Sequence, residues 1–131
     1  MRLIFFLSLC FFGISLFAQD KLLPNTAGLH VAYSENGGNS YNQIAEGIIS
    51  SASVPDAVRF KGKNLIFYVN GDFDNHSIYV SEIGNDGKSP KVLGPITLDG
   101  KIIKDAVDPD LIVTLDGKLR LFYYVGLFTK P

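Results

Sequence analysis

The stretch VPDAVRFKGKNLIFYV, residues 54–69, returns near the end of the chain as DPDLIVTLDGKLRLFYYV, residues 108–125. Each copy contains a Pro-Asp pair, then Gly-Lys, then an apolar run with Phe-Tyr at its centre. Pro55 and Pro109 lie 54 positions apart, and the later parts of the two copies keep this spacing to within one residue. A fixed period of this size indicates a supersecondary unit that occurs more than once.

The segments between the two copies also correspond. Residues 29–38 can be aligned with residues 78–87, and each is a short apolar run followed by a turn rich in Gly and Asn. Short β-branched and aromatic runs separated by Asn-Gly and Asp-Gly turns are typical of an all-β protein, and helical periodicity is nearly absent. The predicted strands lie near residues 28–33, 43–49, 56–60, 64–70, 77–83, 91–98, 110–115 and 118–126.

Four short strands per repeat indicate the blades of a β-propeller. Residues 56–98 then make one complete four-stranded blade, residues 28–49 the outer half of the preceding blade, and residues 110–126 the inner half of the following one. The predicted fold is therefore a partial β-propeller. Because a propeller closes with at least about four blades, we expect a fragment of a longer protein, and the family resemblance given below implies five blades. The alternative is self-association through uncovered blade edges.

The N-terminus has the layout of a secretory signal peptide. Arg2 is followed by an almost unbroken apolar run over residues 3–17, and Ala18 is a small residue at a plausible cleavage point. We expect a signal peptide over residues 1–18, a partial propeller domain over residues 19–131, and a secreted or periplasmic location. An uncleaved membrane anchor is the alternative, and no other membrane association is expected. The only cysteine, Cys10, lies within the signal, so the mature chain has no disulfides.

Charge and composition exclude several classes of ligand. The formal net charge is −1 and no basic cluster occurs, which argues against nucleic acid and anionic lipid as partners. Neutral ligands such as carbohydrate fit this balance better. His30 and His76 have no second ligand at zinc-binding spacing. Residues 72–75, Asp-Phe-Asp-Asn, could hold Ca²⁺ but fit a solvated turn better, so we predict no metal and no cofactor.

The two Pro-Asp copies resemble the five-bladed β-propeller glycosidases that include glycoside hydrolase family 43. In that family an aspartate near the start of an inner strand is the general base, a second aspartate orients substrate, and a glutamate from a later blade is the general acid. The resemblance implies Asp56, Asp108 and Asp110 as candidate catalytic residues. The alternative is that Asp56 and Asp110 accept nearby backbone hydrogen bonds. Asp108 is the stronger catalytic candidate, because its counterpart in the repeat is Val54.

Four further residues are candidates for binding substrate at the central funnel, namely Arg59, Arg120, Tyr68 and Tyr123. A general acid is harder to find, since Glu35, Glu46 and Glu82 all fall in outer-strand regions. The sequence therefore supports two functions. One is an exported, glycoside hydrolase-like protein, of which this chain alone is incomplete and inactive. The other is a non-catalytic propeller that binds glycans or a protein partner through the funnel.

Residues 34–41, SENGGNSY, are similar to the Asp-box of sialidase-type propellers, Ser-x-Asp-x-Gly-x-Thr-Trp. Asn36 stands in place of Asp, Ser40 in place of Thr and Tyr41 in place of Trp. The box stabilises a hairpin far from the catalytic centre. This resemblance therefore implies a structural element of the fold and no activity.

Overall fold

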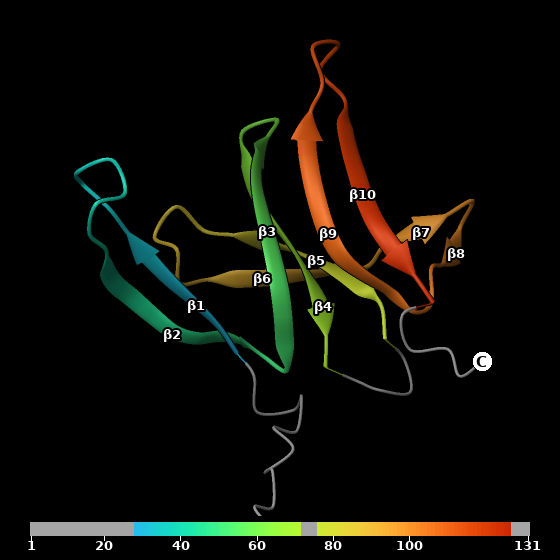
Figure 1. Ribbon diagram of the computed structural model, residues 1–131, viewed down its shortest axis with the longest axis horizontal. Helices are drawn as coiled ribbons and strands as arrows, with labels where there is room; N and C mark the ends of the chain where they lie inside the picture. The colour runs from blue at the N-terminus through green and yellow to red at the C-terminus, as the bar shows by residue number, and fades with distance from the viewer. Residues whose placement is uncertain (1–27, 72–75, 127–131) are drawn as a thin grey trace, which may run out of the picture.

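The computed structural model describes residues 28–71 and 76–126, which form ten β-strands and no helix (Figure 1). All pairings are antiparallel, and none of the sheets is closed. The strands are β1 (Gly28–Tyr33), β2 (Asn42–Ser50), β3 (Ala52–Phe60), β4 (Lys63–Asn70), β5 (Ile78–Ile83), β6 (Pro90–Pro95), β7 (Thr97–Leu98), β8 (Lys101–Ile102), β9 (Ala106–Val113) and β10 (Leu119–Val125).

The strands make one four-stranded sheet and three two-stranded sheets. The large sheet has the order β3-β4-β5-β6, and the pairs are β1-β2, β9-β10 and β7-β8. The sequence predicts the strands of the large sheet and those of the pairs β1–β2 and β9–β10. The predicted signal peptide, residues 1–18, and the turn at residues 72–75 lie outside the described residues. Among the residues described, no helix is long and apolar enough to cross a membrane.

The repeat seen in the sequence recurs in the strand register. In the pairing of β3 with β4, Val54 and Pro55 stand opposite the single residue Tyr68, which makes a β-bulge. In the pairing of β9 with β10, Asp108 and Pro109 stand opposite one residue in the same way. The residue before proline has a positive φ in both copies, 48° and 53°. Proline is accommodated at a bulge because its missing N–H breaks no ladder bond there.

The β1–β2 and β5–β6 hairpins share a second irregularity. Ile44 is an extra residue in β2 opposite the step from Val31 to Ala32. Leu93 is an extra residue in β6 opposite the step from Val80 to Ser81. The positions agree with the alignment of residues 29–38 on residues 78–87. By strand register, β1 and β2 therefore correspond to β5 and β6, while β9 and β10 correspond to β3 and β4.

Apolar side chains fill the spaces on both faces of the large sheet. Phe67 and Val69 of β4 pack against Val107 on β9. Tyr68 lies on the opposite face of β4, where it packs against Leu29 of β1. This alternation is the period of a β-strand, and it accounts for a β4 sequence that is apolar on both faces. Figure 1 shows the three sheets following one another across the molecule, with β3–β6 between β1–β2 and β9–β10.

Two boundaries differ from the sequence prediction. The strand predicted over residues 91–98 ends at Pro95, and residues 97–102 form an additional hairpin, β7–β8. The N–H of Ile96 donates to the carbonyl of Ile78 at 2.9 Å, after which the chain leaves the sheet. The other difference concerns β3 and β9, which begin at residues 52 and 106, four positions before Asp56 and Asp110. The Pro-Asp pairs therefore lie within the strands, because the bulge accommodates proline.

Candidate functional site

Asp56 connects two sheets through its carboxylate. Its Oδ1 accepts the N–H of Ala57 at 2.9 Å, and its Oδ2 accepts the N–H of Leu111 on β9 at 2.6 Å. Hydrogen bonds to a carboxylate are shorter and stronger than those between neutral groups. The sequence allowed either catalysis or backbone hydrogen bonding for Asp56. Both carboxylate oxygens are engaged by backbone donors, so Asp56 has a structural role.

Asp108 and Asp110 flank Pro109 on β9, next to the point where Asp56 contacts this strand. Asp108 is half-buried within the bulge, whereas Asp110 is exposed and stands opposite Phe122 of β10. In the part of the chain that the structure describes, neither carboxylate has a hydrogen-bond or ion-pair partner. The structure thus brings the three candidate aspartates to neighbouring strands. Within the described residues, Asp108 and Asp110 have carboxylates without hydrogen-bond or ion-pair partners.

The backbone at Asp108 is shared with the other repeat. Val54 has φ 48° at the equivalent position, although a β-branched residue rarely adopts the left-handed region and aspartate does so more readily. The unusual conformation at Asp108 is therefore a property of the repeated bulge. What distinguishes Asp108 from Val54 is the carboxylate alone.

The glutamates stand apart from these aspartates. Glu35 is exposed in the turn between β1 and β2, and Glu46 is exposed on β2. Glu82 on β5 forms an ion pair with Lys63 at 2.7 Å. Glu46 and Glu82 therefore lie on β2 and β5, and Glu35 lies in a turn, away from β3 and β9. Among the described residues, neither β3 nor β9 carries a glutamate that could serve as a general acid beside Asp108.

The predicted substrate-binding residues have different environments. Tyr68 is only 4% exposed and packs against Tyr79, with 6.2 Å between the ring centroids. This burial removes Tyr68 from the possible sugar contacts. Tyr123 is half-buried against the core between the large sheet and β9–β10. Arg59 and Arg120 are exposed on β3 and β10, so their guanidinium groups remain accessible.

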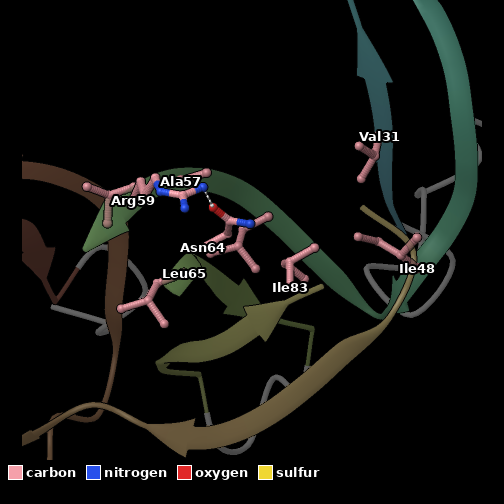
Figure 2. Close-up of a pocket in the computed structure, with 9 residues that line it drawn as sticks. Val31, Ile48, Ala57, Arg59, Asn64, Leu65 and Ile83 are labelled. Atoms are coloured by element: carbon pink, nitrogen blue, oxygen red, sulfur yellow. Dashed lines mark hydrogen bonds between the residues drawn. The ribbon is translucent and has the colours of Figure 1, made fainter. Parts of the chain in front are cut away.

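A cavity of about 280 Å³ lies between the β1–β2 sheet and the first strands of the large sheet (Figure 2). Val31 and Ile48 line it from one side and Ile66 from the other. Its polar lining comes mainly from Arg59 and Asn64, whose side chains are hydrogen-bonded to each other at 3.4 Å. A sugar carries many hydroxyl groups that need hydrogen-bond partners, and this largely apolar lining offers few of them. Sequence patterns did not reveal this cavity, because strands from two different sheets enclose it.

The turn resembling an Asp-box is held together by its own side chains. Asn36 Oδ1 accepts the N–H of Ser40 at 3.0 Å, and its Nδ2 donates to Ser40 Oγ at 2.8 Å. Ser34 Oγ accepts the N–H of Gly38 at 2.9 Å. These bonds support the structural role implied by the resemblance. The polar side chains that the motif supplies are used within the turn itself.

Two other hairpin turns depend on an aspartate. Hydrogen bonds from the Lys88 N–H and the Ser89 hydroxyl hold the pKa of Asp86 below its ordinary value of 3.8. The Lys118 ammonium, 2.7 Å away, and the Thr114 hydroxyl lower the pKa of Asp116. Both carboxylates lie at exposed turns. Across the residues that the structure describes, no three His, Cys, Asp or Glu side chains converge to hold a metal ion.

No family model, curated protein or solved structure matches this chain. A functional assignment for it therefore depends on the geometry of its own residues.

Proposed function

We propose that this chain is part of an exported, carbohydrate-active β-propeller of the glycoside hydrolase type. In this proposal the sheets β1–β2, β3–β6 and β9–β10 belong to successive blades, with β3 and β9 as the innermost strands. The recurring Pro-Asp bulges and the packing of one sheet on the next support the architecture. The link from Asp56 to the Leu111 N–H then joins the inner strands of two neighbouring blades.

The observation that carries the proposed activity is the pair of free carboxylates on β9. Hydrolysis of a glycosidic bond requires one carboxylate as base or nucleophile and one carboxylic acid as proton donor. Asp108 is the proposed base, and Asp110 the proposed group that orients the sugar. Since the described glutamates lie on outer strands and turns, the acid would have to come from elsewhere. The chain alone is therefore proposed to be inactive.

A second candidate function is non-catalytic binding of glycans, or of a protein partner, through the same funnel. The positions of Glu35, Glu46 and Glu82 favour it, because they leave the inner strands without an acid.

One set of measurements distinguishes these functions. The complete propeller to which the chain belongs, and its Asp108→Asn and Asp110→Asn variants, would be titrated with neutral oligosaccharides by calorimetry and incubated with aryl-glycosides, with Glu35→Gln as the matched carboxylate-to-amide control. Turnover that both aspartate variants lose and Glu35→Gln retains would establish a hydrolase. Binding without turnover, weakened about tenfold or more in the aspartate variants, would establish a binding protein. A folded propeller that neither binds nor hydrolyses would contradict both functions.

Export is tested separately. The mature protein is proposed to be secreted or periplasmic and to begin near Gln19, after cleavage following Ala18. The mass of the protein recovered after export reports the cleavage point directly. A mass that retains residues 1–18 would contradict the proposal and favour the membrane-anchor alternative.

A further inference from the structure

The outward face of β9–β10 carries the residues that the equivalent face of the large sheet buries. Phe67 of β4 is 7% exposed and packs in the core against β9–β10, whereas its counterpart Phe122 is 49% exposed. Val69 is 2% exposed, and its counterpart Tyr124 is 66% exposed. Large apolar residues at these positions indicate a face that another sheet covers.

The outward face of β9–β10 also lacks the hydrogen bond that joins the large sheet to β9. Asp56 Oδ2 accepts the Leu111 N–H of the next inner strand, whereas the equivalent Asp110 has no partner among the described residues. The repeat predicts which backbone N–H group would donate a hydrogen bond to Asp110. Leu111 corresponds to Ala57, whose N–H now donates to the aspartate beside it, Asp56. The complementary donor for Asp110 is therefore present in this same chain, on β3.

The sheets β9–β10 and β1–β2 together contain the four strands of one complete unit. By strand register, β9 and β10 correspond to β3 and β4, and β1 and β2 correspond to β5 and β6. Among the residues described, β10 pairs only with β9, and β1 pairs only with β2. Pairing of β10 with β1 would create a sheet of the order β9-β10-β1-β2, which repeats the order β3-β4-β5-β6. The large sheet lies between β1–β2 and β9–β10, so these strands cannot meet within the described part of one chain (Figure 1).

The cavity shows where a second copy would fit. It lies where β1–β2 leaves the first strands of the large sheet uncovered, and its apolar lining includes Val31, Ala57 and Ile66 (Figure 2). In the equivalent space on the other face of the large sheet, β9–β10 covers these first strands. A β9–β10 hairpin from another copy would therefore fill the cavity and bring its β10 beside β1.

We propose that copies of this chain associate head to tail, with β10 of one copy pairing with β1 of the next to complete a composite four-stranded blade. This inference rests on the propeller architecture proposed above. Each copy then supplies one complete blade and half of each of two composite blades, so a ring contains two blades per copy. A heterologous contact of this kind closes into a ring when the rotation allows. Propellers have about four to eight blades, so a closed ring contains about two to four copies.

The internal pairings fix the register of the new contact. Leu65 stands opposite Glu82 in the pairing of β4 with β5, which places Arg120 of one copy opposite Tyr33 of the next. Both side chains are exposed, so cysteine at either position leaves the core intact. Residues opposite each other in an antiparallel pair have Cα atoms about 4.5–5.5 Å apart, within the range for a disulfide.

The first test is the mass of the full chain, measured by light scattering and sedimentation over a range of concentrations. A finite species of two to four copies is expected, and a monomer at all concentrations would overturn the proposal. Phe122→Lys should weaken association about tenfold or more, because a charge replaces an aromatic ring that the contact would bury. Leu98→Lys, at an apolar site on β7 that is 61% exposed, should associate as the parent does.

The second test is cross-linking of Tyr33→Cys/Arg120→Cys under mild oxidation, in a Cys10→Ser background. Disulfides between copies are expected, resolved as multimers on non-reducing gels. Tyr33→Cys/Leu98→Cys is the matched control and should remain a single chain. Association with equal cross-linking in both variants would show that another surface is used and would overturn the proposal. Neither test involves a sugar, so its failure is distinct from failure of carbohydrate binding or hydrolysis.

Discussion

At the scale of single residues, the two Pro-Asp repeats place the same side chain in different environments. Asp56 accepts N–H donors from its own strand and from β9, whereas Asp110 is exposed and unpartnered within the described part of the chain. Equivalent positions in a repeat can therefore have different energetic roles. What differs is whether a neighbouring strand supplies a donor.

Asp56→Ala should lower the free energy of unfolding by about 1.5–3 kcal/mol, because it leaves the Leu111 N–H without its charged acceptor. Asp110→Ala is the matched control. It should change stability by less than about 0.5 kcal/mol in dilute solution, as expected for an exposed side chain without partners. Urea unfolding of the two variants gives both values. Equal losses would contradict the assignment of Asp56 to a structural link.

The turn aspartates predict a loss of stability in acid. The pKa of Asp86 and that of Asp116 are lowered in the folded chain, so the unfolded chain binds more protons as the pH falls below 3.8. Their contribution to stability is therefore present above this pH and is lost as the pH falls through the folded-state pKa.

Asp86→Asn should be less stable than the parent near neutral pH, and the difference in urea midpoint should shrink towards acid. Asp99→Asn, at the β7–β8 turn, serves as a control for the general effect of removing a charge. A difference between Asp86→Asn and the parent that stays constant at all pH values would show that the Asp86 carboxylate does not stabilise the turn.

At the scale of elements, turn and strand signals in the sequence were reliable where the chemistry is local. Gly-Lys and Asp-Gly turns predicted the β3–β4 and β9–β10 hairpins, and the apolar runs predicted their strands. The positive φ of Val54 and the extra hairpin at β7–β8 were not predicted. The φ of Val54 depends on the bulge that β3 forms against β4, which local propensity does not specify. The strands of the β7–β8 hairpin are only two residues long, too short for an alternating pattern to show.

The candidate site was predicted less well than the fold, for a related reason. The sequence selected Asp56, Asp108 and Asp110, and these residues do lie on the neighbouring strands β3 and β9. It could not show that a backbone N–H 55 positions away occupies Asp56, or that Tyr68 is buried. Such facts depend on how sheets stack, which a single repeat unit does not specify.

Turn glycines that contact another sheet should be less replaceable than those that do not. Gly87 has φ +68°, and an added Cβ would lie 2.8 Å from Ile44 Cδ1. Gly117 has a similar φ of +73°, but nothing lies within 4 Å of its Cβ position. Both alanine variants incur the left-handed backbone cost of about 1–2 kcal/mol.

Gly87→Ala should lose about 1 kcal/mol more than Gly117→Ala, because Ile44 must move to accommodate the new methyl group. The difference between the two thermal unfolding midpoints isolates this contact from the shared backbone cost. Identical losses would mean that the β5–β6 turn does not pack on β2.

At the scale of the whole molecule, stability depends on how many faces of each sheet are covered. The large sheet is covered on both faces, and it contains most of the buried aromatic and aliphatic side chains of the described chain. Among the described residues, the flanking sheets β1–β2 and β9–β10 are covered on one face only. A two-stranded sheet is marginal by itself, so the large sheet holds the other two in place.

Phe67→Ala should cost about 3–5 kcal/mol, as expected for an aromatic residue removed from a packed core. Its counterpart Phe122→Ala should cost less than about 1 kcal/mol at protein concentrations where the chain is monomeric, since half of that side chain is already exposed. Chemical unfolding at low concentration measures both. Comparable losses would indicate that Phe122 is covered even in the monomer.

The β7–β8 hairpin has a practical use. Its tip, Asp99-Gly100, is exposed and already has the positive φ values of a tight turn, 51° and 77°. Exposed turn tips accept inserted sequence more readily than any other part of a fold. A peptide tag or fluorescent label between these two residues would therefore provide a handle for purification or imaging without disturbing the link between Asp56 and Leu111.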